Sequence, residues 1–281
     1  MNKNRDLPWS KLCMKLFCYL SFFLGILFCC GLQTATAEDN AEAGKNRIEL
    51  FGSFEYVSPY NNWGDWETLS ASWYRKERPD FTWYVQLQAF WRDEGNGLLA
   101  TVGAYKDWTN FFYTYTDLSV GTNTVFLPQI RVDQDFNFKF GPDKKFVWVV
   151  GGTYIQYFDV HVDYIVSTGL AAYLGKWVAE YRFFENFSTP GWIESCSNLF
   201  SLAYGQEGWH WTTVTFSFGK QAYLATALAT PEAVENNSYY VTLNHRQWLA
   251  KNYGVFGEIS YLDLNSTYKV GGLLLGVFRE F

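Results

Sequence analysis

The residue types best suited to catalysis gather around one histidine and two aspartates upstream of it. Asp133 and Asp135 are separated by a single position, and His161 lies midway between Asp159 and Asp163. A carboxylate and an imidazole that share a water molecule can deprotonate it, which is the chemistry of an aspartyl-type hydrolase. His161, Asp133, Asp135 and Asp163 are therefore the candidates for a catalytic site.

Basic residues close to these aspartates support a structural role for them instead. Arg131, Lys139 and Arg182 lie at positions from which they can neutralise the carboxylates. The interior of a β-barrel is polar, and ion pairs satisfy the charges that point into it. A lipid-modifying enzyme is a second catalytic alternative, but it needs a serine beside His245, and the sequence does not locate one. We therefore expect no catalytic residue.

The sequence contains no recognisable metal or cofactor motif. It has no glycine-rich phosphate loop after a predicted strand, no Cys or His pair at zinc spacing, and no calcium loop. We predict no metal and no cofactor.

The composition restricts the class of protein that can carry these residues. Aromatic residues make up 21% of the 281 positions, whereas charged residues make up 18%, against about 25% in ordinary soluble domains. So much large apolar surface excludes a disordered chain, and a net charge of −6 argues against nucleic-acid binding. A mean hydropathy of −0.15 with so many aromatics fits a transmembrane β-barrel, because each strand alternates a lipid-facing apolar row with a polar inner row.

The N-terminal residues have the pattern of a secretory signal. Lysines and arginines before residue 16 precede an almost wholly apolar stretch, residues 16–32, and Ala35 and Ala37 supply the small residues of a cleavage site. We predict cleavage after Ala37, which divides the chain into a signal peptide (1–37), a flexible N-terminus (38–45) and a barrel (46–281). An uncleaved anchor and a lipoprotein at Cys30 are the alternatives. Cleavage leaves Cys196 as the remaining cysteine.

Alternation of apolar and polar residues predicts an all-β, antiparallel transmembrane barrel of about fourteen strands, with twelve as the alternative. The pattern is clearest over residues 81–92, 130–140 and 176–184. Strands of 10–13 residues match a tilted membrane crossing, for which about 9–11 suffice, and they are long for a soluble β-sandwich, the competing architecture. The predicted strands are 46–57, 64–75, 80–92, 98–107, 109–119, 129–140, 145–157, 160–174, 176–186, 195–204, 210–219, 238–249, 253–262 and 268–281.

The alternation also predicts which side chains line the lumen. The expected row mixes both signs with a slight acidic excess, which favours either paired charges that close the interior or a narrow, weakly selective channel. Four aromatic residues, Tyr84, Phe90, Trp148 and Tyr154, are also assigned to the lumen, where they could stack on sugar rings. The charged or titratable lumen residues are Glu49, Glu55, Arg92, Arg131, Asp133, Asp135, Lys139, His161, Asp163, Glu180, Arg182, Arg246 and Glu258.

The last residue, Phe281, ends a strand with apolar residues at alternating positions. This resembles the signal that bacterial outer-membrane barrels present to their insertion machinery, although Arg279 departs from the usual residue. The expected location is the bacterial outer membrane, and the expected partners are its lipid and lipopolysaccharide together with that machinery. No nucleic-acid partner is expected.

Three short motifs stand out: Gly103-Ala104-Tyr105, Phe126-Leu127-Pro128 followed by Arg131, and the stretch from Thr168 to Phe183. Together they resemble the YaiO family of outer-membrane β-barrels, although Val178 and Ala179 depart from the fuller aromatic run of that family. The resemblance implies an outer-membrane barrel without a well-established activity, and some relatives are linked to exopolysaccharide machinery. The expected function is a non-catalytic channel or assembly component, with polysaccharide or its export proteins as partners. The alternatives are an outer-membrane hydrolase and a purely structural barrel.

Overall fold

The computed structural model describes residues 44–59, 64–220, 237–265 and 267–281. The predicted signal peptide and its cleavage site at Ala35 and Ala37 lie outside the described residues, as does the predicted flexible N-terminus up to residue 43. Among the described residues, no helix is long and apolar enough to span a membrane.

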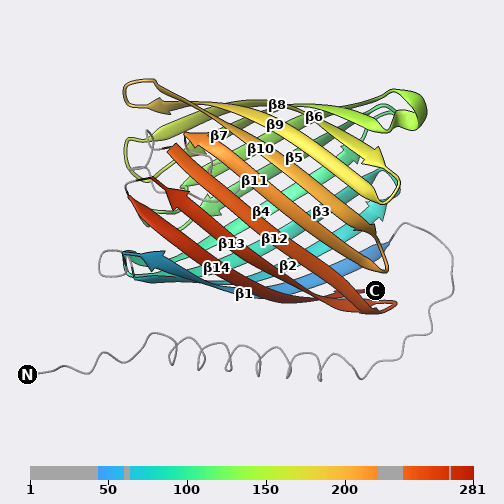
Figure 1. Cartoon of the computed structure of the whole chain (residues 1–281), viewed down its shortest axis with the longest axis horizontal. Coiled ribbons are helices and arrows are strands. Elements are labelled where there is room, and N and C mark those ends of the chain that lie inside the picture. The colour runs from blue at the N-terminus through green and yellow to red at the C-terminus, as the bar shows by residue number, and fades with distance from the viewer. Residues whose placement is uncertain (1–43, 60–63, 221–236, 266) are drawn as a thin grey trace, which may run out of the picture. The chain divides into compact units, whose positions relative to one another are not determined.

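The described chain forms one closed antiparallel barrel in which each strand pairs with its neighbours in sequence and β1 pairs with β14 (Figure 1). This confirms the prediction of fourteen strands. The strands are β1 (Lys45–Ser58), β2 (Asp65–Arg78), β3 (Phe81–Arg92), β4 (Gly95–Asp107), β5 (Phe112–Gly121), β6 (Ile130–Phe140), β7 (Phe146–Gln156), β8 (Val162–Leu174), β9 (Trp177–Thr189), β10 (Ile193–Gln206), β11 (His210–Lys220), β12 (Asn237–Ala250), β13 (Tyr253–Leu264) and β14 (Tyr268–Glu280).

The alternating sequence is what allows these strands to close in a membrane. On β4, Leu99 and Thr101 are buried toward the lumen, whereas Leu98 and Val102 are exposed on the outside. Closure pairs the backbone groups of every strand on both sides, which a hydrocarbon environment demands because it offers no water to bond them. The first and last strands meet in register, with Leu50 opposite Val277.

The connections between strands differ at the two ends of the barrel. At one end they are short turns, such as residues 79–80, 175–176 and 251–252, and both the start of β1 and the C-terminus lie there (Figure 1). Gly175 adopts a φ of 68°, the left-handed conformation that such a tight turn requires. Bacterial barrels place their short turns and both termini in the periplasm, so we call this the periplasmic end and the opposite end the outer end.

The outer surface carries large apolar side chains and aromatic residues near both ends. Trp148 belongs to this surface: it is exposed and lies next to the inward-facing Val147 and Val149. By the same alternation Tyr154 points outward, and its ring centre lies 5.5 Å from that of Tyr164. The prediction that Trp148 and Tyr154 line the lumen was therefore wrong. Because β7 is apolar on both faces, its composition alone does not reveal which row points inward.

Candidate functional site: the barrel lumen

Charged residues along the lumen wall form hydrogen-bonded ion pairs. On β6, Arg131 Nε lies 2.6 Å from Asp133 Oδ2, and Thr153 of β7 donates a 2.6 Å hydrogen bond to the other carboxylate oxygen. From β9, Arg182 donates to both oxygens of Asp135, at 2.9 and 2.5 Å. Asp133 and Asp135 thus each have an arginine partner, which is the structural role that the nearby basic residues suggested.

A second pair joins strands that are far apart in the sequence. Arg246 Nη1 of β12 lies 2.7 Å from Glu49 Oε1 of β1, and Arg47 Nε contacts the same oxygen at 2.9 Å. Nearer the periplasmic rim, Lys139 Nζ lies 2.8 Å from Asp107 Oδ1 of β4. Glu49, which the alternation assigned to the lumen, therefore balances two arginines.

Other acidic residues in the lumen form no salt bridge among the described residues, and two of them accept hydrogen bonds from neutral side chains. Asp163, which is buried, accepts hydrogen bonds from Ser188 and, at 3.4 Å, from Tyr157. Glu258 accepts a 3.4 Å hydrogen bond from Asn244. Glu180 lies near Arg182 and Asp135 without a salt bridge among the described residues. The lumen therefore keeps an acidic excess after its arginines are paired.

One buried carboxylate was not singled out from the sequence. Asp117 of β5 accepts hydrogen bonds from the hydroxyls of Tyr84 and, at 3.0 Å, Tyr115, and Ser119 donates a third at 3.1 Å. The alternation Tyr113, Tyr115, Asp117, Ser119 in the sequence carried this information, because all four residues share one face of a strand.

The structure does not assemble the candidate hydrolytic site. His161 lies in the connection before β8, and its Nδ1 contacts Asp159 Oδ2 of the same connection at 2.5 Å. Asp133 and Asp135 are instead engaged by arginines, and Asp163 by hydroxyl groups. The placement of His161 on the lumen wall with these aspartates is corrected, because the strand alternation that predicted it does not extend into an irregular connection.

The contact between Asp159 and His161 lowers the pKa of Asp159 at the outer rim. Partial burial by itself raises the pKa of Asp159, but hydrogen bonds from the backbone and the ring of His161 outweigh it and hold the pKa below its ordinary value. At the periplasmic end, the hydrogen bond from Lys106 likewise lowers the pKa of Asp80 in the turn after β2. Both contacts favour ionised carboxylates at the ends of the barrel.

The outer end of the lumen is narrowed by the connection between β5 and β6. Phe126 and Leu127 of this loop are completely buried and pack on Phe90 and Leu99 of the barrel wall. A Cβ at Gly97 would collide with the Leu127 side chain, so glycine there makes room for the loop. This packing gives the Phe126-Leu127-Pro128 motif a physical role.

Arg92 of β3 joins this loop to the neighbouring strand β2. Its guanidinium lies between two aromatic rings, 4.0 Å from the Trp66 ring centre and 4.3 Å from that of Phe126. Cation–π contacts of this kind gain strength when water is excluded. Arg92 therefore lines the outer lumen as predicted from alternation, but as an anchor for the loop.

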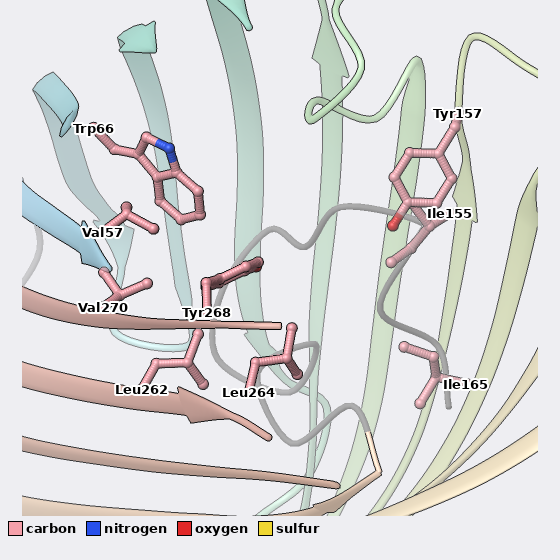
Figure 2. Packing of buried hydrophobic residues seen from close by; sticks show 9 residues of the cluster. All are labelled: Val57, Trp66, Ile155, Tyr157, Ile165, Leu262, Leu264, Tyr268 and Val270. Atoms are coloured by element: carbon pink, nitrogen blue, oxygen red, sulfur yellow. The ribbon is translucent and has the colours of Figure 1, made fainter. Parts of the chain in front are cut away.

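Apolar residues surround the same end of the barrel from several strands. Figure 2 shows Trp66, Val57, Tyr268 and their neighbours from β1, β2, β13 and β14 on one wall, and Ile155 with residues from and beside β7 and β8 on another. These residues form an apolar lining at the outer end of the lumen.

The described residues offer no cluster of three or more His, Cys, Asp or Glu side chains arranged to hold a metal ion. Cys196 is a free, exposed thiol on β10.

The closed barrel with short turns at one end and a polar lumen defines the class of bacterial outer-membrane β-barrels. The model of the YaiO membrane beta barrel domain matches residues 45–224, so the chain belongs to the YaiO family. Its location is the bacterial outer membrane. A search of curated proteins finds no match.

Solved structures share the fold at low sequence identity. The CymD monoaromatic hydrocarbon channel aligns with a TM-score of 0.54 at 6% identity, covering 85% of this chain and 88% of that one. Omp33 of Acinetobacter baumannii gives 0.51 at 12% identity, covering 85% and 100%. A bacterial polysaccharide outer membrane secretin gives 0.51 at 8% identity, covering 86% and 99%. These likenesses concern the fold alone.

Proposed function

We propose that the chain is a non-catalytic channel that passes small hydrophilic solutes across the outer membrane. The observation that carries this proposal is the polar middle of the lumen, whose ion pairs remain accessible. Arg131, Asp135 and Arg246 each keep between 17 and 20% of their side-chain surface exposed. A lumen filled by side chains would bury them, so water reaches the wall between the two ends.

The wall also favours particular solutes. Hydroxyl groups of Ser, Thr and Tyr are frequent among the inward positions, and acidic residues such as Glu180 and Glu258 lack an arginine or lysine partner among the described residues. Neutral, hydroxyl-rich molecules and cations fit this wall better than anions do. A surface or exported polysaccharide, or its export proteins, is the partner we propose on this basis, alongside membrane lipid, lipopolysaccharide and the insertion machinery.

Single-channel conductance tests the proposal directly. Residues 38–281 would be refolded and inserted into a planar bilayer, with heat-modifiable migration on gels as the check of folding. Discrete, reproducible current steps support the channel. A folded barrel that stays silent contradicts it and leaves a structural or assembly role for this chain.

A further inference from the structure

Six tyrosines point into the lumen in the periplasmic half of the barrel, and we call them the tyrosine collar. Strand pairing places Tyr74 opposite Tyr84 and Tyr105 opposite Tyr115. All six occupy inward positions of their strands, on the same faces as the buried Ser72, Thr101 and Asp117. The collar consists of Tyr74, Tyr84, Tyr105, Tyr113, Tyr115 and Tyr173.

The inner layer of the collar is held rigidly. The Tyr84 ring stacks on Tyr74 with centres 5.2 Å apart, and its hydroxyl lies 2.8 Å from that of Tyr115. Asp117 accepts hydrogen bonds from both hydroxyls. A Cβ at Gly103 would overlap the Tyr84 ring, so this glycine provides the space for it. The rings are thus fixed before any ligand arrives, which reduces the entropy lost on binding.

Two members of the collar leave ring surface free. Tyr105 packs against Tyr115 at 4.7 Å, yet it remains 45% exposed, and Tyr173 is 46% exposed. Residues that merely filled the barrel would be covered. On the neighbouring strand β9, the inward-facing Glu180 lies opposite Ala171, two residues before Tyr173.

We propose that the tyrosine collar binds neutral saccharides. A pyranose ring has a flat C–H face that packs on an exposed aromatic ring, and its rim of hydroxyls needs hydrogen-bond acceptors and donors. Tyr105 and Tyr173 supply the rings, while Glu180 supplies carboxylate oxygens beside Tyr173. Aromatic surface with a few fixed polar groups is the usual construction of a small-ligand site.

This inference deepens the proposed channel function by naming the substrate class, but binding can be measured without conduction. The folded barrel, in a detergent that lacks a sugar head group, would be titrated calorimetrically with three neutral hexasaccharides: an α-glucan, a β-glucan and an N-acetylglucosamine polymer. Binding of at least one is expected. Absence of binding by all three, up to millimolar concentrations, overturns the proposal.

Variants test the assignment to these rings. Tyr105→Leu and Tyr173→Leu should each weaken binding, by about tenfold or more together, because they remove the aromatic face, whereas Tyr105→Phe should retain most of it. Tyr239→Leu, on the exposed outer face of β12, is the matched control and should bind normally. Leucine variants that bind like the parent overturn the proposal. A barrel that binds saccharide but conducts no current contradicts only the proposed channel function. A barrel that conducts current but binds no saccharide contradicts only the proposed binding by the tyrosine collar.

Discussion

Arg182 reaches Asp135 across two intervening strands, through space that the absence of a side chain at residue 151 leaves open. The two residues lie 47 positions apart, on β9 and β6, and form a bidentate ion pair. A Cβ at Gly151 would overlap both the Asp135 carboxylate and the Arg182 guanidinium. A glycine on one strand therefore determines which charges can pair on others.

Gly151→Ala should destabilise the folded barrel by about 1–3 kcal/mol, the usual cost of forcing extra volume into a packed site. Urea unfolding in lipid vesicles measures this. Gly271→Ala is the matched control, because a Cβ at Gly271 meets nothing within 4 Å. Equal stability of the two variants would show that the ion pair tolerates displacement.

Phe126→Ala should enlarge the conducting path at the outer end, because Phe126 is the fully buried ring that joins the β5–β6 connection to Phe90 and Arg92. Larger or noisier current steps are expected in a planar bilayer. Val125→Ala, which changes an exposed neighbour in the same loop, should leave the current unchanged. Identical currents in all three proteins would place the narrowest point elsewhere.

The channel should prefer cations over anions, because Asp117, Asp163, Glu180 and Glu258 have only neutral partners or no salt bridge among the described residues. The reversal potential in a potassium chloride gradient reports this preference. Glu180→Gln together with Glu258→Gln should move the potential toward zero. A preference for chloride in the unmodified protein would contradict the assignment of the acidic excess.

His161→Ala should raise the pKa of Asp159 toward its ordinary value near 3.8, since it removes the ring hydrogen bond that lowers this pKa. Carboxyl NMR shifts across a pH titration measure the change. Because a lowered pKa stabilises the folded state only while the group is ionised, this contribution exists above the ordinary pKa and disappears as pH falls through the depressed one. Loss of a measurable hydrolytic activity in this variant would instead revive the catalytic alternative.

Phe281→Ala should slow insertion in cells while leaving the purified barrel about as stable. The ring of Phe281 is exposed, and its backbone N–H and C=O bond Asn46 in either case. Accumulation of unassembled protein in the periplasm is the expected observation. Normal assembly would mean that the machinery recognises another part of the last strand.

The sequence predicts the barrel well because the physics of a membrane strand is local. The segment 81–92 was predicted within one residue at its start, since alternation, length and turn residues all agree there. The lumen charges also follow from alternation alone once the inward row is known. Their particular partners do not, because Arg182 and Asp135 meet only through barrel closure and the gap at Gly151.

The predictions of side-chain orientation fail where a strand is apolar on both faces, and where a strand ends and the alternation of apolar and polar residues stops. β7 is apolar on both faces, so Trp148 was assigned to the wrong side. The inward fold of Phe126 and the position of His161 belong to connections, whose paths depend on the closed barrel around them.

The pairing of the first strand with the last makes completion of the barrel an all-or-nothing event. Asn46 and Phe281 exchange backbone hydrogen bonds at that seam, so every earlier stage of assembly leaves two open edges, one on β1 and another on the most recent strand. An open strand edge in the hydrocarbon region leaves backbone amide groups without hydrogen-bond partners, and it can pair with other chains. A chain interrupted before β14 therefore has no partly functional form, and the cell must shield the entire polypeptide until its final residues arrive.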